Sequence, residues 1–370
     1  MIRIGCLVFV MMAGAFVAPV PLRAQGNADL LQSYVSSYIR QAGLPGAVIG
    51  ISYPDGGMRL ASGGLAKAVP KQPMRDDHLF YIGSLTKMMT AVVILQLAAE
   101  GWLDLSDPVA KWLPPDVGPR IANGHSATIR DLLRNASGIP DYLDGDFFFE
   151  LVGGDPQHGW RNAELLPLIM DRDPHFRAGT RYANSNSNYI LLGVILEHIE
   201  QDDIEQIFAK RIFEPLAMRD TSFGIFPRPA RLARGYDDGN GDGQLEDVSE
   251  FDVGDRLADG GVVSTAADML RFARGLFADG KLLGPNALKR MAEDTLLAGD
   301  GSYGYGLMTG ESDWGPVWGH DGVYFGYSAE FSWFPDQKTA IVFLSNGRAL
   351  NDVPRATQQL LPGLFGAPPL

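Results

Sequence analysis

The sequence predicts an α/β protein of the α+β kind: a mainly antiparallel sheet covered by N- and C-terminal helices, with a mostly helical inserted domain. Three observations lead to this prediction. Strand-like segments stand near both ends of the chain, helix-like segments fill its middle, and two C-terminal strand patterns are separated by a short turn. With 370 residues, 46% hydrophobic and 20% charged, the composition is that of a globular protein with a large core.

Apolar runs and alternating patterns predict the strands. Two such segments occupy residues 46–53 and 58–66, and others lie between 316 and 346. The runs YSAEFSWF and TAIVFLSN are joined by the turn PDQ at 335–337, which is typical of a hairpin. We therefore expect both ends of the chain to share one sheet.

Apolar residues at helical spacing predict the helices, and Thr128 is the expected N-cap of one of them. These helices are expected at 30–42, 84–100, 126–135, 162–171, 186–200 and 203–212. The domain boundaries that follow are 1–24 for a signal peptide, 25–95 with 258–370 for the sheet domain, and 96–257 for the mostly helical insertion. The cleft between the two domains is the expected site.

The N-terminus has the pattern of a secretory signal peptide: Arg3, an apolar run over 4–18, and the small residue Ala24. An uncleaved anchor is the alternative, although the run is shorter than a membrane-spanning helix needs. Cys6, the one cysteine, lies inside this segment, so the mature chain would contain none. An exported protein without cysteine suits the bacterial envelope, and we expect a periplasmic or secreted location.

The net charge limits the partners. A formal charge of −13 argues against nucleic acid and anionic membranes, because either partner needs a basic face. We expect a small-molecule ester or amide or a peptide, cell-wall peptides included, with no cofactor and no membrane span in the mature chain. The oligomeric state stays open.

Ser84 and Lys87 stand three residues apart at the start of an apolar helical run. This spacing puts hydroxyl and amine on one face of a helical turn, so a proton can pass between them. The helix N-terminus would also stabilise a developing oxyanion and disfavour a protonated Lys87. The alternative is that Ser84 caps the helix and Lys87 is a surface ammonium.

Two further short patterns carry possible chemistry. Tyr182 and Asn184 precede another apolar helix; a phenol beside an ammonium has a lowered pKa and can relay a proton, and an amide can bind a substrate carbonyl. His320 and Gly322 end a predicted strand, where a glycine lets an extended substrate lie against the strand edge and a histidine supplies a pH-dependent donor or charge. A loop with a capping Asn and an ordinary strand-end His are the alternatives.

Together the patterns S-x-x-K, Y-x-N and H-x-G occur once each and in this order. In this respect the chain resembles the serine β-lactamases and penicillin-binding D,D-peptidases, in particular the branch of D-alanyl-D-alanine carboxypeptidases, D-aminopeptidases and esterases. Segments such as "FRAGTRYANSNSNYILLG" and "LADGGVVSTAADMLRF" extend the resemblance over nearly all of the mature chain. The resemblance implies a β-lactamase/transpeptidase-like fold and a serine hydrolase.

The resemblance also implies roles for single residues. Ser84 would form the acyl-enzyme, Lys87 and Tyr182 would share the proton transfers, and Asn184 would hold the substrate amide. His320 would replace the lysine of most β-lactamases and, if cationic, lower the pKa of Lys87. The backbone N–H groups of Ser84 and Val323 would form the oxyanion hole.

Asp321 and Gly322 are the expected substrate-binding residues of the third pattern. The resemblance implies that the residue at 321 faces the free carboxylate of a β-lactam or D-Ala terminus. An ionised Asp321 would repel that carboxylate by roughly 1 to 4 kcal/mol unless an arginine compensates. This favours an ester, an amide or an amine-bearing peptide as substrate.

No metal site is expected, and the acidic loop at 237–247 is the one weak candidate. Asp238, Asn240 and Asp242 match the first half of an EF-hand calcium loop, but Ser249 stands where its bidentate Glu should be. A solvated hairpin is the favoured interpretation.

The leading functional hypothesis is therefore an exported serine hydrolase that cleaves an amide or ester, as a peptidase or esterase, through an acyl-serine. One alternative is a D-alanyl-D-alanine carboxypeptidase or β-lactamase acting on carboxylate-bearing substrates. The other is a penicillin-binding or peptidoglycan-sensing protein that acylates without turnover.

Overall fold

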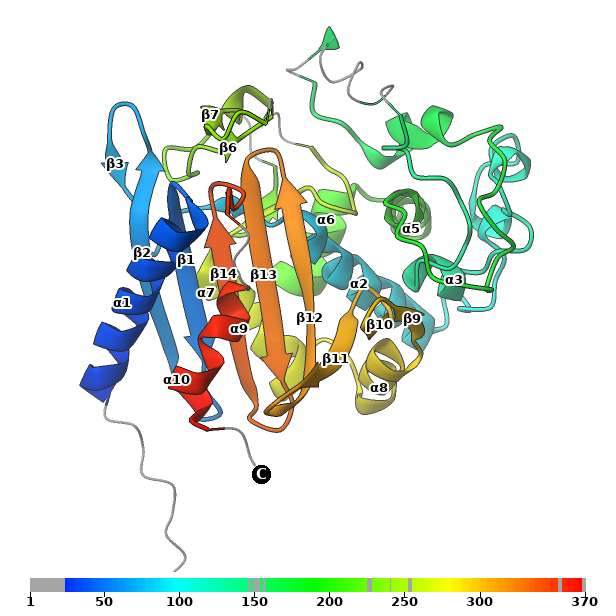
Figure 1. Ribbon diagram of the computed structural model, residues 1–370. Helices are drawn as coiled ribbons and strands as arrows, with labels where there is room; N and C mark the ends of the chain where they lie inside the picture. Colours follow the sequence, from blue (N-terminus) through cyan, green and yellow to red (C-terminus); the bar gives the residue numbers. More distant parts are fainter. Residues whose placement is uncertain are drawn as a thin grey trace, which may run out of the picture.

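A nine-stranded sheet forms one half of the molecule, and all its strand pairs are antiparallel (Figure 1). The computed structural model describes residues 24–145, 148, 154–155, 158–224, 228–239, 241–251, 255–351 and 355–367. In sheet order the strands are β3 (Gln72–Pro73), β2 (Met58–Lys67), β1 (Gly46–Ser52), β14 (Thr339–Ser345), β13 (Tyr327–Phe334), β12 (Gly315–Tyr324), β11 (Met308–Ser312), β10 (Gly301–Tyr303) and β9 (Leu296–Ala298). The predicted antiparallel sheet is confirmed.

The two ends of the chain meet at the centre of this sheet. β1 pairs with β14 in the register Val48↔Leu344, and β13 and β14 form the hairpin predicted from the turn at 335–337. Every residue of β1 and β14 is buried, because helices cover both faces of these strands. This explains why both strands are continuous apolar runs.

Alternate side chains of the central strands enter two separate hydrophobic cores. On one face, α1 (Ala24–Ala42), α9 (Ala356–Gln359) and α10 (Leu361–Phe365) pack on residues such as Ile49 and Phe343. On the other face, Val48 and Leu344 join a larger core that contains α2 (Thr86–Glu100) and α7 (Ala266–Ala273). The N- and C-terminal helices therefore cover the sheet, as predicted.

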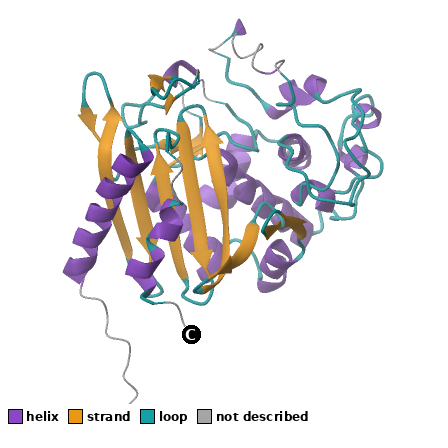
Figure 2. Ribbon diagram, viewed as in Figure 1, coloured by secondary structure: helices purple, strands orange, loops and turns teal. Residues whose placement is uncertain are grey.

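Helices and loops gather on the second face and extend to one side of the sheet (Figure 2). α2 is buried around most of its circumference, and Thr128 caps α3 (Ile129–Leu133) by accepting from the Asp131 backbone N–H. The remaining elements are η1 (Gly83–Leu85), η2 (Val109–Trp112), η3 (Gly118–Arg120), η4 (Asn162–Leu168), α5 (Ser187–Glu200), α6 (Ile204–Phe208), η5 (Ala209–Phe213), η6 (Ser249–Phe251), η7 (Arg274–Ala278) and α8 (Pro285–Glu293), with short strands β4 (Phe80–Tyr81), β5 (Ser222–Phe223), β6 (Tyr236–Asp237), β7 (Glu246–Asp247) and β8 (Val262–Ser264).

Two segments depart in detail from the predicted helices. The segment expected at 162–171 is the 3-10 helix η4, which contains Pro167. The segment expected at 203–212 begins as α6 and continues as the π-helical turn η5. In η4, Pro167 lacks the backbone N–H that a regular α-helix needs, so this segment forms a shorter and irregular helix.

The predicted signal peptide falls almost entirely on residues 1–23, which lie outside the described residues, and the predicted domain boundaries stay predictions. Within the described part of the chain, no helix is both long and apolar enough to cross a bilayer.

Candidate active site

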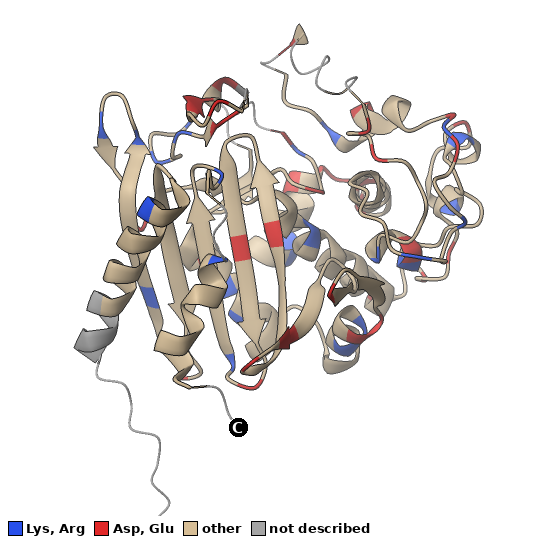
Figure 3. Cartoon of the chain, viewed as in Figure 1, with Lys and Arg blue, Asp and Glu red and all other residues tan. Residues whose placement is uncertain are grey.

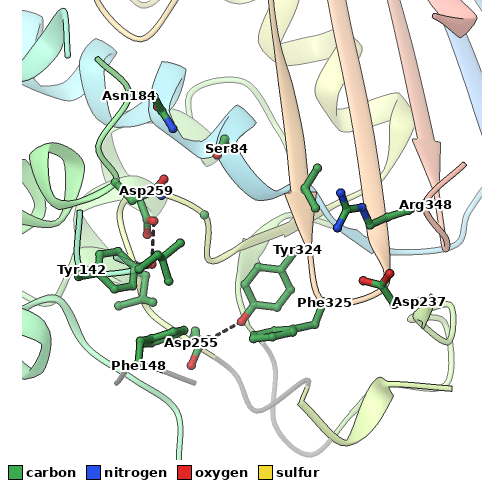
Figure 4. A pocket seen from close by; sticks show the side chains of 15 residues that line it. Ser84, Tyr142, Phe148, Asn184, Asp237, Asp255, Asp259, Tyr324, Phe325 and Arg348 are labelled. Atoms are coloured by element: carbon green, nitrogen blue, oxygen red, sulfur yellow. Dashed lines mark hydrogen bonds between the residues drawn. The ribbon is translucent and has the colours of Figure 1, made fainter. Parts of the chain in front are cut away.

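A cleft of about 460 Å³ lies between the edge of the sheet and the helical side of the molecule. Ser84, Asn184 and Asn186 contribute to its lining, together with Val323 from β12. Figure 4 shows Ser84 at the start of the buried helix and Asn184 above it. The full lining is Ser84, Tyr142, Leu143, Phe148, Asn184, Asn186, Asp237, Asp255, Leu257, Asp259, Gly260, Val323, Tyr324, Phe325 and Arg348.

Ser84 and Lys87 meet as the sequence spacing predicted. Ser84 lies in η1, one turn before Lys87 in α2, and the two side chains are hydrogen-bonded with 2.7 Å between Lys87 Nζ and Ser84 Oγ. Lys87 is only 1% exposed, so the alternative of a surface ammonium is wrong. No side-chain cap bond is formed at the start of η1 or α2, so the Ser84 hydroxyl is not used as a helix cap.

Three acceptors surround the Lys87 amine. Besides Ser84 Oγ, Nζ donates to Asn186 Oδ1 at 2.8 Å and to the backbone oxygen of Asp259 at 3.0 Å. Burial lowers the pKa of Lys87, while the charges of Asp259 and Asp141 act in the opposite direction. A neutral Lys87 in this position can accept the Ser84 proton and keep its other two contacts.

Asn186, which the sequence reasoning missed, is the amide that contacts Lys87. Its backbone N–H and its side-chain Nδ2 both donate to Asp141 Oδ2 at 2.9 Å, which directs Oδ1 toward Lys87. The sequence held a signal for it: "NSN" at 184–186 repeats the residue type at the spacing of the pattern.

Tyr182 and Asn184 have different surroundings: Tyr182 packs against another ring, and Asn184 lies in the cleft. The Tyr182 ring packs against Tyr303 with 5.2 Å between centroids, and Tyr182 is not one of the residues that line the cleft. Burial raises the pKa of Tyr182, so the expectation of a pKa lowered by a nearby ammonium is wrong. Asn184 is exposed in the cleft, and its Oδ1 accepts from Asn135 Nδ2 at 3.3 Å.

β12 reaches the serine with its backbone. β11 pairs with β12 only as far as Gly319, so the edge beyond that residue faces η1 instead. A Cβ on Gly83 would lie 2.7 Å from Val323 N and 2.5 Å from Val323 O, so these backbone atoms point at the segment that carries Ser84. This arrangement agrees with the oxyanion hole predicted from Ser84 and Val323, whose role stays a prediction.

The structure gives the glycine at position 322 a role other than the predicted one. A Cβ at this position would lie 2.0 Å from the carbonyl oxygen of Ile82. The glycine therefore lets β12 pack directly on the chain before Ser84, rather than making room for a substrate.

His320 is buried, and it does not supply the predicted charge. Its Nδ1 lies 2.6 Å from the Asp321 carbonyl oxygen and its Nε2 lies 3.0 Å from the Tyr303 hydroxyl. Because a carbonyl can only accept, Nδ1 carries the proton and Nε2 accepts from Tyr303. Burial lowers the pKa of His320 to about 3, so a cationic His320 that lowers the pKa of Lys87 is wrong.

Asp321 does not face the cleft. It lies opposite Glu330 in the β12–β13 pairing, and Glu330 accepts from the backbone N–H groups of Ala356 and Thr357 at the start of α9. Cross-strand partners point to the same face of a sheet, so Asp321 points toward α9, where Arg355 forms an ion pair with it. The predicted repulsion of a substrate carboxylate by Asp321 is therefore wrong.

Asp259 is a second residue that the sequence reasoning missed. It lies in the cleft, is 5% exposed, and accepts from the Tyr142 hydroxyl at 3.0 Å (Figure 4). Burial raises its pKa, and the charge of Lys87 opposes this rise. Asp259 lies in the family-like segment "LADGGVVSTAADMLRF", but no short pattern singles out Asp259 or Asp141, and only the folded chain brings them close to Lys87.

The acidic loop at 237–247 forms the β6–β7 hairpin, where acidic residues concentrate in Figure 3. Asp238 accepts from the backbone N–H groups of Asp242 and Gly243, and Asp242 accepts from that of Gln244. Asn240 lies outside the described residues. Within those residues, no group of three or more His, Cys, Asp or Glu side chains could hold a metal.

Comparisons with known proteins agree with this geometry. The chain is 28% identical over 306 residues to penicillin-binding protein 4* of Bacillus subtilis (strain 168), covering 76% of this chain and 64% of that protein. It is 29% identical over 225 residues to esterase EstB of Burkholderia gladioli, covering 59% of this chain and 57% of that esterase. The chain thus spans less than two thirds of the length of these two relatives.

Among solved structures, a D-stereospecific amidohydrolase from Streptomyces sp. superposes with a TM-score of 0.78 at 27% identity. The superposition covers 91% of this chain and 98% of the amidohydrolase. The family described as Beta-lactamase matches residues 31–362. With this match, the fold and the Ser84–Lys87 pair, the chain belongs to the beta-lactamase family of serine hydrolases.

Proposed function

We propose that the protein is an exported hydrolase that cleaves an ester or amide bond through an acyl-serine at Ser84. The hydrogen bond between Ser84 Oγ and the buried Lys87 Nζ carries this proposal. A serine hydroxyl is a weak nucleophile until a neighbouring base removes its proton, and a buried lysine with a lowered pKa can serve as that base. The names of two relatives, an esterase and an amidohydrolase, support the ester or amide class.

The proposed reaction has two steps. Ser84 Oγ bonds to the carbonyl carbon as its proton passes to Lys87 Nζ; the bond to the leaving group then breaks, and the leaving group takes that proton from Lys87 or departs as an anion while Lys87 loses the proton to solvent. Water next attacks the acyl-serine as one of its protons passes to the neutral Lys87, the bond to Ser84 Oγ breaks, and Lys87 returns the proton to Ser84 as the acid is released. The backbone N–H groups of Ser84 and Val323 would stabilise the oxyanion in both steps. Export rests on the signal-peptide pattern of residues 1–24.

The test is mass mapping of the acylated residue together with kinetics of Ser84→Ala. A fluorophosphonate should label Ser84, and Ser84→Ala should lose several orders of magnitude in kcat/KM for a nitrophenyl ester. Ser33→Ala, on the exposed side of α1, is the matched control and should keep full activity. Unchanged hydrolysis in Ser84→Ala would refute the proposal.

A carboxylate-bearing substrate is a second candidate, favoured by one observation. Arg348 is the one basic side chain among the described residues that line the cleft. A guanidinium binds carboxylates well, and Asp321 no longer argues against them. Turnover of nitrocefin or a D-Ala-D-Ala peptide faster than a neutral ester would favour this candidate. A long-lived acyl-enzyme without turnover would instead favour a penicillin-binding sensor.

A further inference from the structure

Tyr182, the phenol expected from the Y-x-N pattern, packs against Tyr303 and is not one of the residues that line the cleft beside Ser84 and Lys87. The three hydrogen bonds of Lys87 Nζ go to Ser84, Asn186 and Asp259. The Tyr189 ring also lies 5.7 Å from Nζ, but the Tyr189 hydroxyl donates to the Leu133 backbone oxygen at 2.8 Å. The asparagine that contacts Lys87 is two residues later than the pattern predicted. The Y-x-N pattern has a tyrosine two residues before its asparagine. Two residues before Asn186 the chain has Asn184, which is exposed in the cleft.

The tyrosines that do line the cleft are engaged elsewhere. The Tyr142 hydroxyl donates to Asp259 at 3.0 Å, and the Tyr324 hydroxyl donates to Asp255 (Figure 4). A phenol that donates to a carboxylate is not available to protonate a leaving group. Burial also raises the pKa of both phenols, which makes them weaker acids still.

Asn184 cannot replace a phenol as an acid. Its Oδ1 accepts from Asn135, which leaves the Nδ2 group for the cleft. An amide N–H can donate a hydrogen bond to a substrate, but it does not release a proton at any physiological pH. Asn135 itself is buried and held by Asn188 Nδ2, which donates to Asn135 Oδ1 at 2.7 Å, so the orientation of Asn184 is fixed from below.

We infer that this chain acts on esters with good leaving groups in strong preference to amides, because the described residues of the cleft offer no tyrosine acid beside Ser84 and Lys87. The inference rests on the proposed function. In acylation, Ser84 bonds to the carbonyl carbon and its proton moves to Lys87. A phenoxide or a stabilised alkoxide can then depart as the anion and take a proton from water. An amine must be protonated before the C–N bond breaks, and the Lys87 ammonium, which is hydrogen-bonded to Ser84, would have to do this without help from a phenol.

The test compares leaving groups at a constant acyl group. We expect kcat/KM for 4-nitrophenyl, phenyl and trifluoroethyl butanoate to fall steeply as the leaving-group pKa rises, with butananilide slowest. Here kcat/KM reports the acylation step. Tyr182→Phe and Tyr142→Phe should leave this dependence unchanged, because neither phenol acts on the leaving group.

Asn184→Tyr places a phenol at the missing position, and Asn184→Phe is its matched control because it adds the ring without the hydroxyl. Asn184 is exposed, so both rings can be accommodated. We expect Asn184→Tyr to raise the anilide-to-ester ratio of kcat/KM by about 10-fold or more over Asn184→Phe, within the range that a general acid contributes.

Three results would overturn the inference. One is a wild type that cleaves the anilide as readily as the phenyl ester. Another is a loss of about 100-fold in anilide activity in Tyr182→Phe or Tyr142→Phe. The last is an equal change in Asn184→Tyr and Asn184→Phe, since ring bulk rather than a proton would then set the ratio. Each differs from failure of the proposed function, which would appear as unchanged hydrolysis in Ser84→Ala.

Discussion

At the scale of single residues, the protonation of Lys87 is set by two opposed effects. Burial favours the neutral amine, which can accept the serine proton, whereas Asp259 and Asp141 favour the ammonium. Neither carboxylate forms a side-chain ion pair with Lys87, and the closest link to Asp259 runs through its backbone oxygen. The two carboxylates therefore act on Lys87 mainly through their charge.

Asp259→Asn should move the acid limb of the pH–rate profile to lower pH. Removing the negative charge takes away an effect that raises the pKa of Lys87, so the neutral amine persists to lower pH. The direction of the shift follows from the loss of this negative charge, which favours the ammonium form of Lys87 in the wild type. The measurement is kcat/KM for a neutral ester against pH, which avoids titration of the substrate.

Asp255→Asn is the matched control for this shift. Asp255 lines the same cleft and also accepts from a tyrosine, but it is not among the causes of the Lys87 pKa. The acid limb of the pH–rate profile of Asp255→Asn should lie at the same pH as that of the wild type. If the acid limb of Asp259→Asn stays at the wild-type pH or moves to higher pH, the protonation of Lys87 does not determine that limb.

At the scale of elements, the contact between η1 and β12 assembles the site. Gly83 adopts a positive φ of 52°, and Gly322 lies under the Ile82 carbonyl, so backbone packs on backbone at both positions. This contact brings Val323 N against Gly83, the residue before Ser84, across more than 200 residues of sequence. Ser84, the proposed nucleophile, and Val323, the proposed oxyanion donor, are therefore positioned by glycines rather than by side-chain bonds.

Gly322→Ala should separate these two elements. Its Cβ would lie 2.0 Å from Ile82 O, a backbone atom that cannot move alone, so β12 must shift away from η1. Loss of one oxyanion donor lowers kcat by about 100- to 1000-fold. We expect a loss of this order in kcat/KM, with a destabilisation of about 1 to 3 kcal/mol from overpacking.

Gly310→Ala in β11 is the control for this substitution, because a Cβ there meets no atom within 4 Å. It should leave both kcat/KM and the melting temperature close to wild type. Wild-type activity in Gly322→Ala would instead mean that the Val323 N–H is not an oxyanion donor.

At the scale of the whole molecule, the sequence predicted the arrangement of elements well for physical reasons. The apolar runs of β1 and β14 are continuous because both faces of these strands are buried. The turn at 335–337 is so short that β13 and β14 can pair only as an antiparallel hairpin. The Ser84–Lys87 contact was predictable because it is local, within one helical turn.

Contacts between distant segments were not predictable in the same way. Lys87 and Asn186 are 99 residues apart, and only the position of Asp141 decides which asparagine of the "NSN" segment turns toward the lysine. The neutral state of His320 depends on burial against Tyr303, which leaves no mark in the sequence. The side of the sheet that Asp321 faces follows from strand alternation once His320 is known to point inward.

Asp255 links the two sides of the molecule. Its Oδ1 accepts from the Trp160 backbone N–H at 2.9 Å on the helical side, and its Oδ2 accepts from the Tyr324 hydroxyl on β12. The residue is 2% exposed, and burial raises its pKa from 3.8 to about 6. The folded protein therefore favours the protonated acid more than the unfolded chain does.

The stability of the protein should accordingly fall with pH in a defined window. Because the folded pKa of Asp255 is raised, its contribution to stability is fully present below the unfolded pKa of about 3.8 and is lost as pH rises through about 6. A difference of about 2 pKa units corresponds to about 3 kcal/mol. Asp255→Asn, which keeps an acceptor and a donor but carries no charge, should therefore gain stability over wild type as pH rises from 4 to 7, by up to that amount. Denaturant unfolding at pH 4, 5, 6 and 7 measures the difference, with exposed Asp76→Asn as the control for loss of one negative charge. A gain that shrinks with rising pH would show that Asp255 stabilises the fold as the carboxylate, held by its two donors against the cost of burial.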